Sequence, residues 1–106
     1  MKQKVSDYIA DHIAEWGIRD VFTVTGGGAM HMNDAFGHHP KLHCTYQHHE
    51  QACAMAAEAY ARMDNRMAAV CVTTGPGATN AITGVLGGWM DSIPMLVFSG
   101  QARDRK

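Results

Sequence analysis

One carboxylate in the sequence lies where a short apolar run gives way to a long alanine-rich segment. Glu50 follows the run 41–47, and apolar residues recur at helical spacing from Ala52 to Met63. A glutamate in the first turn of a helix interacts favourably with the helix dipole, by about 0.3–1 kcal/mol. Held out at the end of a strand, the same carboxylate can instead exchange a proton with a bound ligand. The residue and its spacing leave both roles open.

Two glycine-rich segments follow apolar runs and would let a flat ligand lie close to the backbone. The segment 73–77 reads TTGPG and lacks the Lys-Ser/Thr pair of a P-loop. The segment 26–31 reads GGGAMH, so His31 occupies the position of the third glycine in a dinucleotide fingerprint. A nucleotide-binding α/β domain is therefore disfavoured. A thermal shift on adding nicotinamide or adenine nucleotides would test that alternative.

The histidines and cysteines do not show the spacing of a metal site. The adjacent histidine pairs at 38–39 and 48–49 cannot share a helix face, and no zinc-type spacing appears, so we expect no metal ligands in this chain. The three cysteines lie far apart inside apolar runs and form no C-x-x-C pair; they are Cys44, Cys53 and Cys71. This pattern indicates free thiols in a reducing compartment, and hence a cytoplasmic protein.

Length and charge narrow the class of protein. The 106 residues are 46% apolar and 18% charged, which is enough for a packed core in one domain or part of one. The net charge of -1 indicates neither a nucleic-acid partner nor a membrane surface. The segment 1–16 carries three acidic residues and no uninterrupted apolar stretch, so we expect no signal peptide. No run approaches the roughly 20 apolar residues of a membrane span.

Predicted strands and helices alternate along the chain. The strands are expected at 20–25, 41–47, 67–74 and 95–100, and the helices at 5–16, 29–37, 50–62 and 78–89. The last two strands are apolar throughout, as strands are when helices cover both faces of a parallel sheet. We therefore predict a parallel α/β sheet with helices on both faces and ligand-binding loops at the carboxyl ends of its strands. Because doubly wound domains usually have about five or six strands, we expect truncation after the fourth.

Three glycines interrupt the last predicted helix. Gly84, Gly87 and Gly88 each cost about 1 kcal/mol relative to alanine in a helix interior. Such a cost indicates close approach of another backbone. A partner subunit and tight packing on the sheet are both consistent with that pattern.

Two longer stretches resemble a known family. The segment 48–62, HHEQACAMAAEAYAR, and the segment 70–101, which contains TTGPGATN and D-x-x-P, resemble the pyrimidine-binding (PYR) domain of thiamine-diphosphate-dependent enzymes. The similarity is greatest to acetolactate synthase large subunits and related decarboxylases and carboligases. It covers nearly the whole chain, so residues 1–106 are identified as a partial N-terminal PYR domain.

The resemblance implies a catalytic role for Glu50. In the family this glutamate hydrogen-bonds N1′ of the cofactor's aminopyrimidine and favours the imino tautomer, which takes the proton from C2 of the thiazolium before attack on a 2-keto acid such as pyruvate. The resemblance also implies a set of cofactor-binding residues, with Glu50 among them: Gly27, Gly28, Thr74, Gly75, Pro76, Gly77, Asn80 and Gln101.

The resemblance further implies parts that these residues lack. The motif that binds diphosphate and Mg²⁺ belongs to a C-terminal (PP) domain, which with the central domain is absent from this sequence and usually comes from a partner subunit. We therefore expect a homodimer or larger assembly and no activity from these 106 residues alone. The resemblance also allows FAD as a cofactor, because some acetolactate synthases bind it. Thr23 and Thr25 replace a glycine and a proline that acetolactate synthases usually carry, which leaves room for another 2-keto acid. The alternative function is a non-catalytic dimerisation module that retains the fold.

Overall fold

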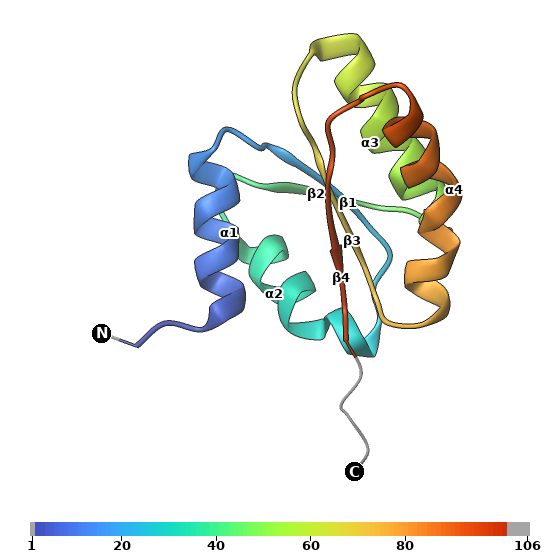
Figure 1. The fold of residues 1–106 in the computed structure, drawn as a ribbon. Coiled ribbons are helices and arrows are strands. Elements are labelled where there is room, and N and C mark those ends of the chain that lie inside the picture. Colours follow the sequence, from blue (N-terminus) through green and yellow to red (C-terminus); the bar gives the residue numbers. More distant parts are fainter. Residues whose placement is uncertain (1, 102–106) are drawn as a thin grey trace.

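Four parallel strands alternate with helices in the computed structural model of the protein, which describes residues 2–101 (Figure 1). In chain order the elements are α1 (Val5–Glu15), β1 (Asp20–Thr23), the 3-10 helix η1 (Gly27–Ala29), α2 (Met30–His38), β2 (His43–Tyr46), α3 (Glu50–Asp64), β3 (Ala69–Val72), α4 (Pro76–Met90) and β4 (Leu96–Ser99). The strand order is β2-β1-β3-β4, and every neighbouring pair is parallel. The predicted parallel α/β fold is confirmed.

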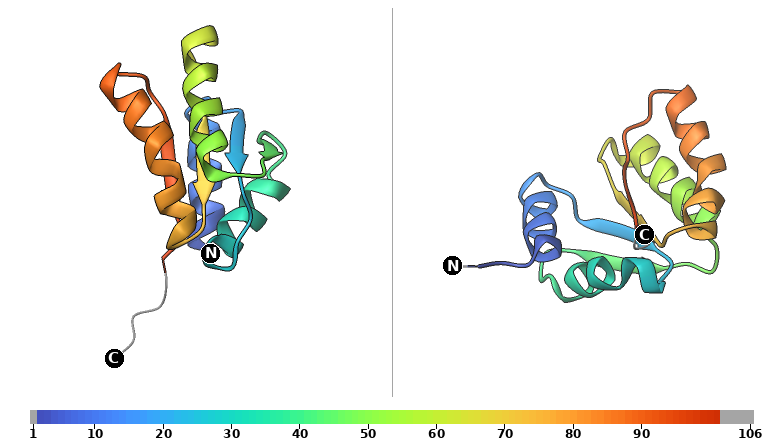
Figure 2. Two further views of the ribbon diagram at one scale, coloured as in Figure 1. Left: turned by 90° about the vertical axis from the view of Figure 1, so that its right-hand side faces the viewer. Right: turned by 60° about the horizontal axis from the view of Figure 1, so that its bottom comes forward.

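Two helices cover each face of the sheet (Figures 1 and 2). Helices α1 and α2 pack on one face, and α3 and α4 pack on the other. Successive residues of β3 point to opposite faces, so Ala69 and Cys71 join the first core while Val70 and Val72 join the second. All four residues of β3 are buried. This double burial explains why the predicted strand 67–74 is apolar throughout.

The paired strands are shorter than the apolar runs that predicted them. Each strand has four residues, and positions such as Thr25 and Thr73 lie beyond the paired region. The chain leaves β3 because Gly75 adopts φ 65°, a conformation that glycine tolerates better than other residues. The residues trimmed from the carboxyl ends of the strands therefore build the loops at that edge of the sheet.

Local sequence signals set both ends of α3. Its N-cap is His49, whose Nδ1 accepts the backbone N–H of Gln51 at 3.0 Å. Its C-cap is Asn65, which has φ 53° and donates its backbone N–H to the carbonyl of Ala61 at 2.9 Å. Helix α4 begins with Pro76, which has no N–H to leave unpaired in the first turn. These signals place Glu50 at the first position of α3.

The glycines of α4 pack within the chain. A methyl group built on Gly84 would lie 2.5 Å from Cβ of Ala54, and one on Gly87 would lie 3.0 Å from Oε1 of Glu58. Both contacts are to α3, whereas Gly88 faces the side chain of Met95 ahead of β4. Tight packing on the neighbouring helix α3, and not on the sheet, therefore explains Gly84, whereas the nearest neighbours of Gly87 and Gly88 are the ends of flexible side chains.

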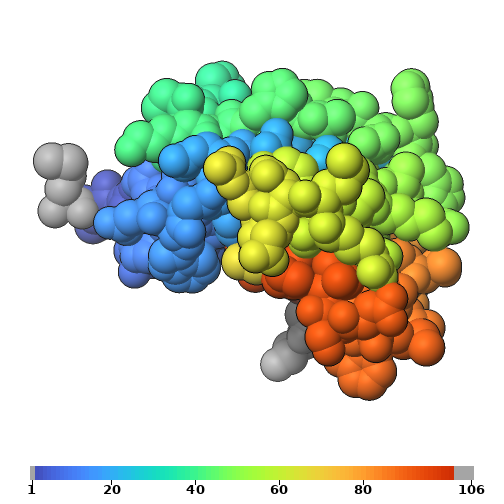
Figure 3. All heavy atoms as spheres, turned by 90° about the horizontal axis from the view of Figure 1, so that it is seen from above, coloured from blue at the N-terminus to red at the C-terminus, as the bar shows by residue number. Residues whose placement is uncertain are grey.

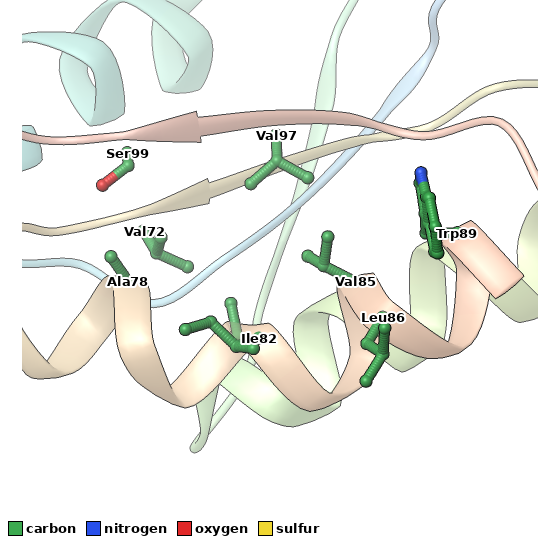
Figure 4. A pocket seen from close by; sticks show the side chains of 9 residues that line it. Val72, Ala78, Ile82, Val85, Leu86, Trp89, Val97 and Ser99 are labelled. Atoms are coloured by element: carbon green, nitrogen blue, oxygen red, sulfur yellow. The ribbon is translucent and has the colours of Figure 1, made fainter.

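Strand β4 forms one edge of the sheet and is flanked by apolar grooves. A groove of about 380 Å³ lies between α4 and β4 (Figure 4). The side chains of Ile82, Leu86 and Trp89 line it and are between 50% and 76% exposed. A second groove lies on the other face, between α1 and β4, and its lining includes Phe98. Strand β4 thus carries the two-sided apolar pattern of an interior strand while lying at an edge.

The C-terminal ends of α3 and α4 contact each other. Figure 3 shows the turn after α3 (yellow) against the loop after α4 (orange to red). There Arg62 donates to Glu58 at 2.9 Å and to Asp91 at 2.5 Å.

In the described part of the chain, no helix has the length and apolar character required to cross a membrane.

Candidate functional site

The carboxyl ends of the four strands bring the predicted site segments to one edge of the sheet. Segment 24–28 follows β1, segment 47–50 follows β2, segment 73–77 follows β3, and Gly100 follows β4. The helices run back along the sheet, so the first turns of α3 and α4 lie at the same edge (Figure 2, right). Because β1 and β3 are adjacent, their two glycine-rich loops are neighbours.

Glu50 and Asn80 form a hydrogen-bonded pair at this edge. The amide Nδ2 of Asn80 donates to Oε1 of Glu50 at 3.2 Å. Glu50 is half-buried at the start of α3, and Asn80 is exposed in the second turn of α4. The hydrogen bond occupies one carboxylate oxygen and leaves Oε2 available to another group.

The GPG turn lies beside the second oxygen of Glu50. A methyl group built on Gly77 would lie 3.5 Å from Oε2 of Glu50, an ordinary van der Waals distance, so the turn and this carboxylate oxygen are neighbours. Gly77 itself is buried, while Gly75 and Pro76 are exposed at the rim. The turn and the carboxylate therefore form one surface on which a flat polar ring can lie.

Thr73 joins the two glycine loops, and sequence analysis did not single it out. Its Oγ1 accepts the backbone N–H of Gly28 at 2.9 Å. A methyl group on Gly26 would lie 2.5 Å from Cβ of Thr73, and one on Gly77 would lie 2.7 Å from its Cγ2. Three glycines thus pack around a single side chain. Only the adjacency of the loops after β1 and β3 reveals this arrangement.

Of the remaining predicted positions, Gly27, Gly28 and Thr74 lie at or beside the first glycine loop, whereas Gln101 is not joined to the pair of Glu50 and Asn80. A methyl group on Gly28 would lie 2.7 Å from Cγ2 of Thr74, and the backbone of Gly100 packs directly on the Gly28 carbonyl. Gly27 has open space around it and belongs to the same loop. Gln101 is exposed after β4, and no hydrogen bond among the described residues joins it to Glu50 or Asn80.

A buried polar network supports the loop from below. The hydroxyl of Thr23 donates to the carbonyl of Cys71 at 2.7 Å and accepts from Nδ2 of Asn33 at 2.9 Å. The threonine that departs from the acetolactate synthase pattern therefore ties β1 to β3 and α2. Its side chain is buried, at 1% exposure, and acts within the core.

The ionisable groups near Glu50 are thiols and imidazoles. Burial raises the pKa of Cys53, one turn along α3, to about 11, and the negative charge of Glu50 adds to the rise. His49 caps α3, whereas His48 is exposed. Among residues 2–101, no group of three or more His, Cys, Asp or Glu side chains is arranged to hold a metal ion.

Comparison with protein families identifies the chain. Residues 3–106 match the family described as thiamine pyrophosphate enzyme, N-terminal TPP binding domain. The chain belongs to this family. The match extends across both glycine loops and Glu50, and it confirms the resemblance found in segments 48–62 and 70–101.

Known relatives of this thiamine pyrophosphate enzyme domain are acetolactate synthases. Acetolactate synthase 2, chloroplastic, of Zea mays is 37% identical over 103 residues, 97% of this chain and 16% of the relative. The acetolactate synthase large subunit of Lactococcus lactis subsp. lactis (strain IL1403) is 36% identical over 96 residues, 91% of this chain and 17% of the relative. The acetolactate synthase large subunit of Buchnera aphidicola subsp. Schizaphis graminum (strain Sg) is 45% identical over 85 residues, 80% of this chain and 15% of the relative. The chain thus spans about a sixth of these relatives.

The residues at the strand ends fit the pyrimidine half of thiamine pyrophosphate. An aminopyrimidine presents ring nitrogens and an amino group around a flat ring, which needs a carboxyl group at one edge and open backbone beside it. Glu50 supplies that carboxyl, and the GPG turn beside it has Gly75 and Pro76 exposed. A diphosphate needs cationic or metal partners. The loop segments 24–28, 47–50 and 73–77 contain no lysine or arginine, and residues 2–101 hold no group of three or more His, Cys, Asp or Glu side chains arranged for a metal ion.

Proposed function

We propose that this chain is the pyrimidine-binding part of a thiamine-diphosphate-dependent, acetolactate synthase-like enzyme acting on 2-keto acids such as pyruvate. The observation that carries the proposal is the hydrogen bond from Asn80 to Oε1 of Glu50, with Oε2 turned towards the backbone of Gly77. Family membership and the acetolactate synthase relatives support the cofactor and the substrate class.

Glu50 is the catalytic residue of this proposal. Its carboxyl group holds a proton at Oε2 and donates it in a hydrogen bond to a ring nitrogen of the aminopyrimidine. Asn80 fixes the orientation of the carboxyl group by donating to Oε1.

The other loops bind and orient the ring. Gly75, Pro76 and Gly77 present backbone to one side of it, and the loop of Gly27 and Gly28 borders the same space. Thr74 shapes the turn, and Gln101 lies at the rim, towards the substrate. When bound, thiamine diphosphate supplies a nucleophilic carbon and an electron sink for chemistry at the carbonyl of a 2-keto acid.

Further parts of the enzyme complete the site. We infer that the diphosphate and its Mg²⁺ are held by a domain outside these 106 residues, contributed by a partner subunit in a dimer or larger assembly. The exposed rim of Gly75, Pro76 and Asn80 leaves room for that second surface. On this proposal the 106 residues alone bind the pyrimidine half weakly and turn over no substrate.

The test uses the full-length gene product with thiamine diphosphate and Mg²⁺. Pyruvate consumption is compared between the wild type and Glu50→Gln, which keeps the size of the side chain but has no acidic proton. We expect Glu50→Gln to lose about 10²-fold or more in turnover, as for a proton-transfer group, while the cofactor still binds. Glu58→Gln, on the same helix, is the matched control and should retain turnover. Unchanged turnover in Glu50→Gln would refute the role of Glu50.

The alternative is a non-catalytic module that dimerises through α4. Its strongest sequence feature was the run of glycines, and those glycines pack against α3 and Met95 of the same chain. A module without catalysis would also have no need for the pair of Glu50 and Asn80. Retained dimerisation together with absent cofactor binding in the wild type would favour the module.

A further inference from the structure

We propose that Thr73 is a positioning residue of the cofactor site, whose hydroxyl group holds the glycine loop 26–28 against the GPG turn beside Glu50. The inference rests on the proposed function, which assigns both loops to the cofactor. It concerns a residue that follows β3 and lies outside the predicted set of site residues.

The hydroxyl group of Thr73 makes the first contact. Its Oγ1 accepts the backbone N–H of Gly28 at 2.9 Å, across a sequence separation of 45 residues. Gly28 lies in the 3-10 helix η1, where its N–H is too early in the turn to have an intrahelical partner. Thr73 therefore satisfies a backbone donor that the loop cannot satisfy by itself.

The methyl group and Cβ of Thr73 make the second set of contacts. The Cα of Gly26 lies so close that a methyl group there would be 2.5 Å from Cβ of Thr73. On the other side, a methyl group on Gly77 would be 2.7 Å from Cγ2 of Thr73. The same side chain thus contacts the loop after β1 and the turn that borders Glu50, so displacement of either loop is transmitted through Thr73.

Position and chemistry both separate this role from ordinary core packing. Thr73 lies past the end of β3 and is only half-buried, whereas the four residues before it are fully buried. Valine has the same branched shape and would fill the same volume, but it has no hydroxyl to accept from Gly28. The contribution of the hydrogen bond can therefore be separated from that of the volume.

The first experiment measures the loop directly. Hydrogen exchange by mass spectrometry is recorded on a peptide that covers residues 26–30 in the full-length gene product without cofactor. We expect Thr73→Val to speed exchange at Gly28 by about tenfold, the effect of losing one hydrogen bond, and Thr73→Ser to stay close to wild type. Thr83→Val makes the same chemical change at an exposed position of α4 and should leave this peptide unaffected. If Thr73→Val does not fold, Thr73→Ala removes the hydroxyl together with the methyl group, and its comparison with Thr73→Ser, which keeps the hydroxyl alone, gives the contribution of the hydroxyl.

The second experiment connects the loop to the site. In the presence of thiamine diphosphate and Mg²⁺, we expect Thr73→Val to lower kcat for pyruvate by about tenfold with KM nearly unchanged, and Thr73→Ser to restore most of the loss. Unchanged exchange at Gly28 in Thr73→Val would overturn the proposal, and so would faster exchange with unchanged kcat. A wild type that binds no cofactor would refute the proposed function instead, and the two failures are therefore distinct.

Discussion

The side chains of Glu50 and Asn80 are joined by a hydrogen bond of 3.2 Å that links the first turn of α3 to the second turn of α4. The two residues are 30 positions apart in the sequence, and they meet because α3 and α4 begin at the same edge of the sheet. The packing of α3 on α4, with Gly84 against Ala54, fixes the separation of the two helices. The orientation of the carboxyl group is therefore set by helix packing as well as by its own helix.

Removal of the amide of Asn80 should weaken catalysis without unfolding the protein. Because Asn80 is exposed, Asn80→Ala loses little packing. It does lose the hydrogen bond that orients the carboxyl group of Glu50, and a hydrogen bond between neutral groups contributes about 0.5–1.5 kcal/mol. We expect turnover of a 2-keto acid by the full-length gene product to fall by up to about tenfold.

The control for that variant is Thr83→Ala, one turn further along α4, which should keep wild-type turnover. Circular dichroism should show the same helix content in both variants. Equal turnover in Asn80→Ala and Thr83→Ala would show that Glu50 is oriented by other contacts.

Replacing a glycine of α4 by alanine should have opposite effects on the free energy of unfolding at positions 84 and 87. In Gly84→Ala the new methyl group would meet Cβ of Ala54 at 2.5 Å and the backbone nitrogen of Met55 at 3.0 Å. Overpacking of this kind costs about 1–3 kcal/mol, which exceeds the roughly 1 kcal/mol that alanine gains over glycine in a helix. We expect a lower free energy of unfolding for Gly84→Ala, measured by urea denaturation of the 106-residue chain.

Gly87→Ala is the matched comparison on the same helix. Its methyl group would meet only Oε1 of Glu58 at 3.0 Å, the mobile end of a side chain. We therefore expect Gly87→Ala to leave the free energy of unfolding unchanged or to raise it by up to about 1 kcal/mol. A Gly84→Ala variant as stable as Gly87→Ala would contradict the close packing of α3 on α4.

The fold could be predicted from the sequence to a greater extent than the contacts of the site. The two-sided apolar pattern of segment 67–74 was sufficient to predict a parallel sheet with its loops at one edge, and Glu50 lies there. Family resemblance gave Asn80 only as a cofactor-binding residue, and its contact with Glu50 was not predicted, because spacing along one helix does not show which side chain of another helix it meets. Thr73 was missed because its contact with Gly28 depends on the adjacency of β1 and β3.

The helix glycines illustrate the same difference. Their cost in a helix interior indicated a close neighbour, and the sequence left a partner subunit and the sheet equally open. The neighbour of Gly84 and Gly87 is α3. Periodicity gives the face of a helix that is buried, but the crossing of two helices depends on how their side chains interlock.

The buried thiols should make stability fall at high pH. Burial raises the pKa of Cys53 and of Cys71 to about 11 in each case, and the charge of Glu50 contributes at Cys53. Because these pKa values are higher in the folded than in the unfolded chain, the stabilisation is complete below about pH 9 and is lost as pH rises towards 11. We expect the free energy of unfolding of the 106-residue chain to decline across this interval.

The double variant Cys53→Ala/Cys71→Ala isolates the two buried thiols from the other ionisable groups of the chain. Its free energy of unfolding should decline less steeply than that of the wild type between about pH 9 and 11. The comparison uses slopes, so a uniform loss of stability from the smaller side chains does not affect it. Parallel slopes for the two proteins would show that the thiols titrate alike in the folded and unfolded chains.

The groove between α4 and β4 should bind apolar probes. Ile82 and Trp89 line it and are 58% and 76% exposed, and Val97 of β4 lies across from them (Figure 4). A contiguous exposed apolar patch of this kind is unusual on a monomeric soluble protein, and such a patch binds apolar dyes. We expect a fluorescent naphthalene dye to bind the 106-residue chain. Binding is measured by titrating the dye and recording the quenching of Trp89 fluorescence or the energy transfer from Trp89 to the dye.

Two neighbouring substitutions on α4 separate the groove from the rest of the helix. Ile82→Glu places a carboxylate in the groove and should weaken dye binding by about tenfold, since burying a charge against apolar side chains is costly. Thr83→Glu adds the same charge at an exposed position that does not line the groove, and should leave dye binding unchanged. Equal losses in the two variants would mean that the dye responds to the net charge of the chain. A loss confined to Ile82→Glu would show that the two-sided apolar pattern of β4 leaves an open surface beside α4.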